Sequence, residues 1–239
     1  MLSPRWRKVL RDLWSNKTRT VLVIFSIAIG ITAIGMVMGA QVIVDQSLPA
    51  AYAAVNPSDG IIFCLSTFDD DMVESIRAMP EVDKAEGRRF VHVRFQTGGE
   101  NGDGTWYNMQ LNAIPDYEEM AINRVAAQEG EFPPPRHSLL IERASLSPTL
   151  GLGEVGIDDV LLIEPPNGKK RSVRMAGTLH DMSQLPAFIN GSGYGYINFD
   201  TLEWLGEPRD FNQIVFTVAE TGPDTDASDP EYVNAVAKE

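Results

Sequence analysis

Residues that commonly carry chemistry are sparse in this sequence of 239 residues. Its three histidines, His92, His137 and His180, are far apart in the chain, and none has a second histidine at the helical spacing of a metal site. His180 and Asp181 could together serve a metal ion or a general base, but a dipeptide is a weak signal and a surface turn is the better interpretation. We therefore predict no catalytic residue, no cofactor-binding residue and no metal ligand.

Other reactive or glycine-rich segments favour structural roles. The single cysteine, Cys64, lies in the apolar run Ile61–Leu65, which predicts a buried thiol without a disulfide partner. The glycine-rich segment Gly191–Gly195 leads into a predicted strand, whereas a phosphate-binding loop leaves a strand and opens a helix. Asp69–Asp71 could bind a cation, but acidic residues at the start of a predicted helix favour capping.

Charge is distributed unevenly along the chain. The first 20 residues contain six basic side chains and one acid, which leaves 14 basic and 32 acidic groups in residues 41–239. A surface with this excess of acid repels nucleic acid, so we predict no nucleic-acid partner. The excess also keeps a domain soluble, and that is its simplest interpretation.

A long uncharged segment follows the basic start. No charged residue occurs from Thr20 to Val44, and residues 21–44 are long and apolar enough for a transmembrane helix. The apolar core of a signal peptide is shorter, although Ala51-Tyr52-Ala53 resembles a cleavage site and leaves cleavage as an alternative. The positive-inside rule places the N-terminus in the cytoplasm and the main domain outside the cell membrane.

The segment before this helix has an amphipathic pattern. Apolar and basic residues alternate at helical spacing, which predicts an interfacial helix over residues 1–20 in contact with membrane lipid. The alternative is a plain cytoplasmic tail that only sets topology. The predicted anchor residues are Trp6, Arg7, Lys8, Arg11 and Trp14.

Three glycines recur near one face of the predicted transmembrane helix. Small residues at this spacing allow two helix backbones to approach closely, although glycine is also common in membrane helices in general. The residues predicted to pack against another helix are Gly30, Gly35 and Gly39.

Beyond the membrane segment, hydrophobic periodicity predicts an α+β domain. The first part contains a helical continuation over residues 45–57, a buried strand Gly60–Leu65, a helix Phe68–Met79, and strands Arg89–Gln96 and Trp106–Ile114. The middle part contains a strand Ser138–Glu142, a helix Arg143–Leu150, and a hairpin of Val160–Glu164 with Lys170–Leu179. The last part contains strands Tyr194–Phe199 and Asn212–Ala219 and helices Asp200–Leu205 and Pro230–Lys238.

The order of these elements predicts a divided architecture. We expect one N-terminal transmembrane helix followed by a split β-α-β lobe, residues 45–115 and 180–239, interrupted by a small β-rich insert, residues 116–179.

The chain resembles the N-terminal part of FtsX/MacB-type ABC transporter permeases. The resemblance starts with Asn16-Lys-Thr-Arg-Thr20 and Ala28-Ile-Gly-Ile31 at the first membrane helix. It continues with Glu129-Gly-Glu-Phe-Pro133, Leu140-Ile-Glu-Arg-Ala144 and Leu150–Gly156, and closes with Val173–Gly177. Each motif is a loose match by itself, but the motifs occur in the same order as in the family, and the resemblance covers nearly the whole chain.

The resemblance implies a permease subunit that is not an enzyme. Such a subunit binds no cofactor, because a separate cytoplasmic ABC ATPase binds ATP, and it transmits ATPase-driven motion to its extracytoplasmic domain. Implied partners are this ATPase, a second permease in a homo- or heterodimer, and an extracytoplasmic adaptor protein. Three further membrane helices are expected after residue 239, so the sequence is interpreted as a truncated permease.

Two other functions stay open from the sequence. One is a single-pass, membrane-anchored extracytoplasmic sensor or binding module. The other, weaker one is a membrane-anchored hydrolase that uses His180 and Asp181.

Overall fold

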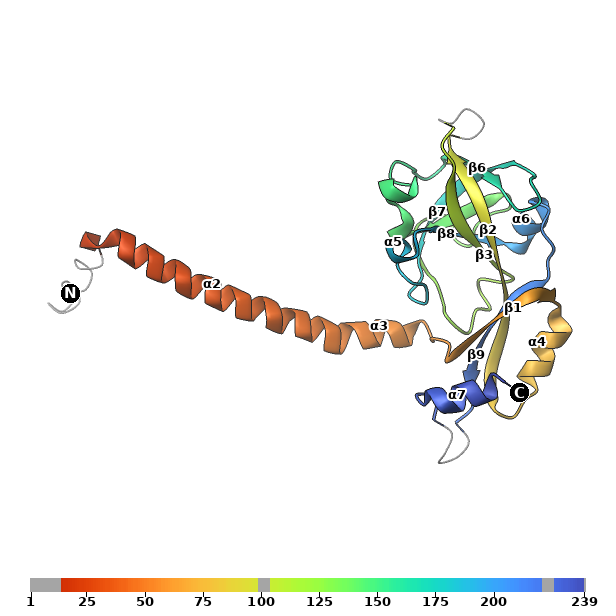
Figure 1. The fold of residues 1–239 in the computed structure, drawn as a ribbon, viewed down its shortest axis with the longest axis horizontal. Helices are drawn as coiled ribbons and strands as arrows, with labels where there is room; N and C mark the ends of the chain where they lie inside the picture. The colour runs from red at the N-terminus through yellow and green to blue at the C-terminus, as the bar shows by residue number, and fades with distance from the viewer. Residues whose placement is uncertain (1–13, 99–103, 221–225, 239) are drawn as a thin grey trace. The chain divides into compact units, whose positions relative to one another are not determined.

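The computed structural model describes residues 14–98, 104–220 and 226–238. They form two compact units, one up to Ala53 and one from Ala54 onward (Figure 1). The helices are α2 (Lys17–Val42), α3 (Leu48–Ala54), α4 (Asp70–Arg77), α5 (Ala187–Asn190), α6 (Phe199–Trp204) and α7 (Pro230–Val236), with a π-helical turn at Ile43–Ser47 and 3₁₀ turns at Arg143–Ser145 and Pro148–Leu150. The strands are β1 (Gly60–Phe68), β2 (Val82–Thr97), β3 (Tyr107–Ile114), β4 (Ala126–Gly130), β5 (Ser138–Glu142), β6 (Val160–Glu164), β7 (Arg171–His180), β8 (Gly193–Asn198) and β9 (Phe211–Val218).

The first unit contains the predicted membrane helix. The segment Lys17–Asp45 is the one stretch of the described residues that is long and apolar enough to cross a membrane, with a mean hydropathy of 2.6. None of the residues of α2 is buried within the chain. The predicted interfacial helix over residues 1–20 lies mostly outside the described residues. Trp14 is the one predicted anchor residue that is described, and its side chain is 85% exposed.

Six strands of the second unit close into a ring. The hydrogen-bonded path runs from β2 through β3, β8 and β5 to β7, and β6 pairs with both β7 and β2. Most of these contacts are antiparallel, but β3 with β8 and β5 with β7 are parallel. The ring is therefore a small mixed barrel, whose interior is filled by side chains in the manner of other small barrels.

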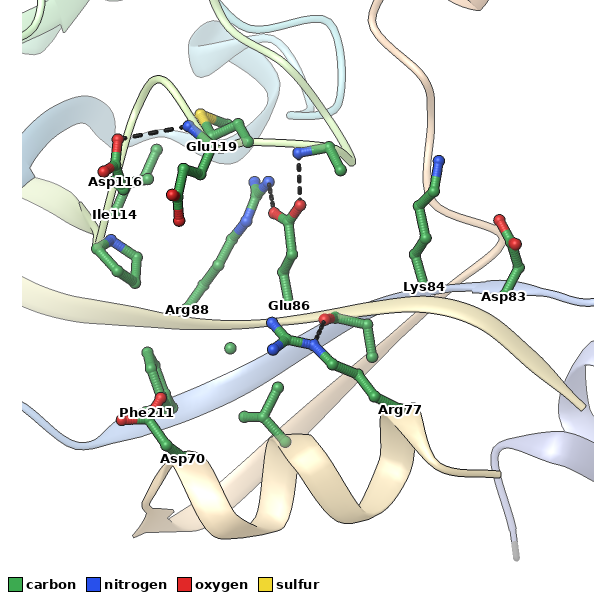
Figure 2. Close-up of a pocket in the computed structure, with 16 residues that line it drawn as sticks. Asp70, Arg77, Asp83, Lys84, Glu86, Arg88, Ile114, Asp116, Glu119 and Phe211 are labelled. Atoms are coloured by element: carbon green, nitrogen blue, oxygen red, sulfur yellow. Dashed lines mark hydrogen bonds and ion pairs between the residues drawn. The ribbon is translucent and has the colours of Figure 1, made fainter. Parts of the chain in front are cut away.

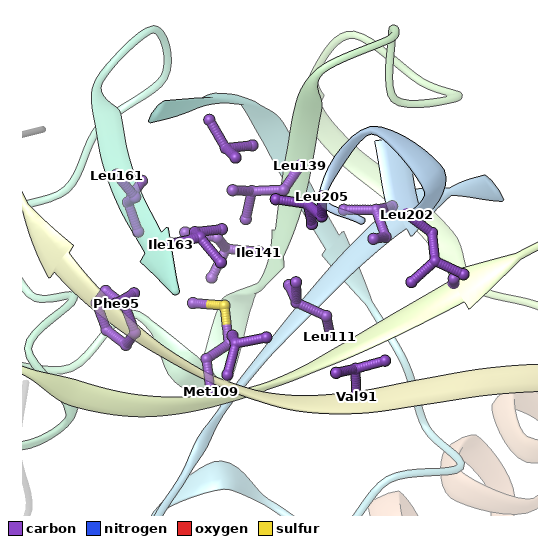
Figure 3. Packing of buried hydrophobic residues seen from close by; sticks show 14 of the residues in the cluster. Val91, Phe95, Met109, Leu111, Leu139, Ile141, Leu161, Ile163, Leu202 and Leu205 are labelled. Carbon is purple, nitrogen blue, oxygen red and sulfur yellow. The ribbon is translucent and has the colours of Figure 1, made fainter. Parts of the chain in front are cut away.

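The interior of this barrel is the main hydrophobic core of the domain. Alternate residues of each strand point inward, since side chains of a strand alternate between its two faces. Figure 3 shows these side chains converging from β2, β3, β5 and β6. Leu202 of α6 and Leu205, which follows α6, complete the group. The core includes Val91, Phe95, Met109, Leu111, Leu139, Ile141, Leu161, Ile163, Leu202 and Leu205.

Strand β2 belongs to two sheets at once. Its first half, Val82–Arg88, pairs with β9, and β9 pairs with β1. Its second half, Arg89–Thr97, pairs with β3 and β6 in the barrel. On one face of the three strands β1, β9 and β2, side chains of α4 and α7 pack on a second core, which includes Phe216.

The observed pairing changes the predicted division of the domain. Strands β5, β6 and β7 come from the range 116–179 that was expected to form an insert, whereas β2, β3 and β8 come from the flanking ranges. All six share the barrel, so these ranges do not form two separate sheets. The α+β class with one N-terminal apolar helix is confirmed.

Several elements differ from the predictions for physical reasons. The strand over Gly60–Leu65 exists but is not buried, because β1 is an edge strand, and Cys64 is only half-buried. The expected helix Arg143–Leu150 consists of two 3₁₀ turns, since Pro148 keeps the preceding Ser147 extended. The left-handed Gly151 ends the second turn. Strand β4 was not predicted, because all five of its residues are exposed and it has no apolar alternation.

Candidate functional site: the segment after the membrane helix

Three of the five residues after α3, Val55, Asn56 and Ser58, are bound to a distant loop of the domain. Asn56 donates its side-chain amide to the carbonyl oxygen of Ala121 over 2.5 Å. In return, the main-chain N–H groups of Asn123 and Arg124 donate to the carbonyl oxygens of Asn56 and Val55, both over 2.8 Å. A segment with such paired main-chain groups is held in position and is not a free linker.

Asn123 makes the second half of this connection. Its side-chain oxygen accepts from the N–H of Ser58 over 2.8 Å, and its side-chain amide donates to the hydroxyl of Ser58 over 3.0 Å. The residue is 2% exposed and has a left-handed backbone with φ of 47°, and Asn56 has φ of 50°. Asparagine tolerates this conformation better than most residues do, which explains its occurrence at both positions.

The same loop is tied to β2 by a charged pair. One carboxylate oxygen of Glu86 accepts from the N–H groups of Ala121 and Ile122, over 2.6 and 3.0 Å. The other oxygen accepts from Arg88 over 3.2 Å, and Arg88 also donates to the carbonyl oxygen of Ile122. Arg88 is 8% exposed, so its charge is balanced inside the protein by Glu86.

The end of the segment is fixed to β9. The N–H of Asp59 donates to the carbonyl oxygen of Phe216 over 3.0 Å, and its carboxylate accepts from the N–H of Val218 over 2.8 Å. Burial raises the pKa of Asp59, the hydrogen bond from Val218 lowers it, and the nearby acids Glu220 and Asp83 raise it further, so the net shift is upward. We use the name anchor network for Asn56, Ser58, Asp59, Glu86, Arg88 and Asn123.

A cleft of about 600 Å³ borders the anchor network (Figure 2). In the figure, Glu86 and Arg88 point from β2 toward the loop that carries Asp116 and Glu119. On the α4 side, Arg77 donates to the carbonyl oxygen of Ala85 over 2.6 Å. The charges that line the cleft are of both signs, and the described residues contain no group of three or more potential metal ligands. The cleft therefore has no clear catalytic constellation.

His180 and Asp181 do not act as a pair. His180 contacts the buried Glu142, with 3.1 Å between Nδ1 and Oε1. Asp181 turns to other partners: it accepts from the hydroxyl of Tyr196 over 2.5 Å and from the N–H of Ser183 over 2.7 Å. Burial, reinforced by Asp181, raises the pKa of Tyr196, so this phenol stays protonated and donates. The dipeptide is part of the folded core and the hydrolase interpretation has no geometric support.

The other candidate residues have structural roles. His137 stacks on Trp204 with 4.2 Å between ring centroids, and His92 lies against Phe90. The side chain of Asp69 accepts from the N–H of Met72, so the predicted capping of α4 is confirmed. The left-handed Gly191 ends α5, and Gly193 begins β8, so the glycine-rich segment enters a strand as expected.

The glycines of the membrane helix have empty surroundings. A methyl group added at Gly30, Gly35 or Gly39 would meet no other atom within 4 Å. Their packing against another helix stays a prediction, as does the role of Trp6, Arg7, Lys8 and Arg11, which lie outside the described residues.

No protein-family model and no curated protein matches the chain in sequence. Among solved structures, it is similar to the extracellular domain of the noncanonic ABC-type transporter YknZ from Gram-positive bacteria, with 9% identity, a TM-score of 0.44, and coverage of 74% of this chain and 86% of that one. It is also similar to the periplasmic region of MacB from Actinobacillus actinomycetemcomitans, with 9% identity, a TM-score of 0.46, and coverage of 74% and 79%. One of these structures is an extracellular domain and the other a periplasmic region. Both TM-scores lie below 0.5, so neither structure assigns a function to individual residues.

The sequence alone did not identify the anchor network. Its members are ordinary polar residues that lie far apart in the chain, as Ser58 and Asn123 do at 65 positions. The one local signal is Asn56-Pro57, because a residue before proline avoids the right-handed helical region and so ends the preceding helix.

Proposed function

We propose that this chain is part of the permease subunit of an ABC transporter, and that its domain receives motion from the membrane helix. The observation that carries the proposal is the fixed state of residues 55–59. Five hydrogen bonds join Val55, Asn56 and Ser58 to residues 121–124. A displacement of Val55 and Asn56 would therefore move the loop 121–124, because these hydrogen bonds join the two segments directly.

The connection continues from the loop into the barrel. Glu86 and Arg88 bind the main chain of residues 121 and 122, and both lie on β2. The same strand continues to Thr97 inside the barrel. Hydrogen-bonded strands move together more readily than they separate, so β2 is suited to carry the displacement across the domain.

The remaining parts of the proposal come from the sequence. The basic residues before α2 favour a cytoplasmic N-terminus and an extracytoplasmic domain. A separate cytoplasmic ATPase would bind ATP and supply the motion, and the permease would not be an enzyme. A second permease chain and an extracytoplasmic adaptor would complete the complex. The complex would serve export, or a process that involves lipoproteins or the cell envelope.

The test uses the protein expressed from its own gene and purified in mild detergent. We expect an ABC ATPase to co-purify with it. In that complex, hydrogen exchange of the amides of Ile122, Asn123 and Arg124 should differ between the ATP-bound and the nucleotide-free state. A variant Asn123→Ala should weaken this response and keep the ATPase bound, whereas the exposed Asn234→Ala serves as the matched control. The proposal would be rejected if no ATPase co-purified and if the hydrogen exchange of these amides were the same in the ATP-bound and nucleotide-free states.

A sensor or binding module is the second candidate. The observation that favours it is an exposed apolar tip formed by Leu185, Phe188 and Ile189, which are 64%, 72% and 62% exposed. Its base is fixed by Asp181 and by the fully buried Ala187. A module of this kind would bind its partner without an ATPase, so the same co-purification separates the two functions.

A further inference from the structure

The fold holds the apolar tip of Leu185, Phe188 and Ile189 in a fixed position between β7 and β8, at the short helix α5 (Figure 1). Ala187 is fully buried between the exposed residues. Before the tip, the hydroxyl and the N–H of Ser183 donate to the carboxylate of Asp181, over 2.5 and 2.7 Å. An ordered segment thus keeps three large apolar side chains together in water, which is typical of a surface that binds something.

The main chain of the tip pairs its own N–H groups. Those of Ile189 and Asn190 donate to the carbonyl oxygen of Pro186, over 2.8 and 3.2 Å, and that of Gly191 donates to the carbonyl oxygen of Ala187 over 2.8 Å. An unpaired main-chain group is costly to move out of water. The tip can therefore enter an apolar layer at a lower cost than an irregular loop could.

Charge is absent from the tip and from the residues around it. Residues 182–199 contain no charged side chain, whereas residues 41–239 as a whole carry 18 more acidic than basic groups. Anionic headgroups of a membrane repel an acidic surface but not an uncharged one. The lack of basic side chains in this segment also disfavours an acidic partner, so the chemistry of the tip fits an apolar layer.

The base of the tip lies beside the anchor network. Ser183 and Gln184 line one small cavity together with Ile61 and Asn123. Asn123 in turn binds Asn56 and Ser58, which belong to the segment through which the chain enters the domain. The tip is therefore close to the part of the domain that is nearest in sequence to the membrane segment.

The length of the connection keeps the domain near the bilayer. Ten residues separate Asp45, where the apolar segment ends, from Val55. Ten residues span about 15 Å as a helix and at most about 36 Å when fully extended. For any orientation of the two units, the domain stays within this distance of the lipid. Such a tether raises the effective concentration of the membrane surface, so even a weak lipid contact is populated.

We propose that the apolar tip inserts into the surface of the bilayer that holds α2. Leu185, Phe188 and Ile189 enter the boundary between headgroups and acyl chains, as the apolar faces of interfacial helices do. The domain thereby gains a second attachment to the membrane, in addition to the chain that enters through the anchor network. The inference rests on membrane anchoring by α2 and needs no ATPase, so it goes beyond the proposed function.

Fluorescence of a labelled full chain tests this contact. Cys64→Ser removes the native thiol, and Ile189→Cys then carries an environment-sensitive NBD label on the chain reconstituted in phosphatidylcholine liposomes. We expect a blue-shifted emission, and quenching by nitroxide groups attached to the lipids. Both signals follow from transfer of the label from water into the apolar layer.

Ile157→Cys with the same label is the matched control. Ile157 is 41% exposed, and its neighbour Asp158 lines a hollow with Thr97. Thr97 lies nine residues beyond Arg88 on β2, which is about 30 Å of strand, and Arg88 lines the same cavity as Gln184. The label at position 157 should therefore stay in water and escape the lipid nitroxides.

Substitutions in the tip give a second measurement. Leu185→Ser combined with Phe188→Ser should reduce the quenching at position 189 severalfold. The thermal unfolding midpoint should change little, because both side chains are exposed. Met72→Ser is the control for loss of an exposed apolar residue, since Met72 is 50% exposed on α4, and it should leave the quenching unchanged.

Three results would overturn the lipid contact. One is the absence of quenching at position 189, and another is equal quenching at positions 157 and 189, which indicates that the domain contacts lipid without preference for the tip. The third is a blue-shifted emission at position 189 that lipid nitroxides do not quench, because the label then lies against protein and the tip belongs to a binding module. The permease proposal survives each result if the ATPase still co-purifies.

Discussion

The N–H of Asn123 donates to the carbonyl oxygen of Asn56 over 2.8 Å, and both residues have left-handed backbones. Both side chains also bond across the same contact, one to Ala121 and the other to Ser58. This relationship fixes the residues that follow α3 to a loop more than sixty positions away. It is the basis of the first prediction.

Asn123→Ala should destabilise the domain by about 2–3 kcal/mol. The substitution removes two side-chain hydrogen bonds in a buried position and places alanine in a left-handed conformation. Urea unfolding followed by tryptophan fluorescence measures the loss. Asn123→Gly should recover the part that is due to the backbone, and Asn234→Ala on the exposed face of α7 should have little effect. Equal stabilities of Asn123→Ala and Asn234→Ala would contradict the anchor network.

The pair Glu86 and Arg88 should show strong coupling in a double-mutant cycle. Glu86→Ala leaves the buried Arg88 without its counter-charge and frees the N–H groups of Ala121 and Ile122, so we expect a loss of about 3 kcal/mol. Arg88→Met in the same chain should recover part of the loss, because it removes the unpaired charge. Strict additivity of the two substitutions would show that the pair acts as two independent surface residues.

Asp59 should make the domain more stable at mildly acidic pH. Burial raises the pKa of Asp59 in the folded state above the ordinary aspartate value of 3.8. As pH rises, the folded protein therefore keeps the proton of Asp59 to a higher pH than the unfolded chain does. The contribution to stability is therefore present at low pH and is lost as pH rises from about 4 through the folded pKa. Asp59→Asn keeps an oxygen acceptor for Val218 but cannot ionise. The variant should therefore have a higher melting temperature at pH 7, and its melting temperature should change less between low and neutral pH.

Comparison of melting temperatures at pH 4.5 and pH 7 checks this sign. The exposed Asp226 serves as the control, because hydrogen bonds from Ser228 lower its pKa. A larger pH dependence in Asp59→Asn than in the unsubstituted chain would reverse the argument.

The barrel interior should be sensitive to truncation. Ile141 of β5 is fully buried in the core shown in Figure 3, so Ile141→Ala should cost about 2–5 kcal/mol. Ile157 is 41% exposed, and Ile157→Ala should cost less than about 1 kcal/mol. Both values are measured by urea unfolding. A similar small loss at both positions would mean that the barrel is not the stabilising core.

The sequence by itself determined the local and one-dimensional features of this protein. The uncharged run from Thr20 to Val44 predicted the membrane helix, since length and hydropathy alone decide whether a segment can span a bilayer. Asp69 and Pro80 set the limits of α4, because capping and helix termination depend on neighbouring residues. Alternation of apolar residues located most of the strands.

Only the tertiary structure decided which strands pair and which polar residues meet. Closure of the barrel through β6 depends on contacts between β2 and residues about seventy positions later, and periodicity carries no record of pairing partners. The exposure of β1 at the edge of the sheet was also decided by the tertiary structure, because its apolar residues predicted a buried strand in the sequence. Asn56, Asn123, Glu86 and Arg88 form the anchor network because the fold brings them together, and hydrogen bonds between residues distant in sequence depend on that proximity.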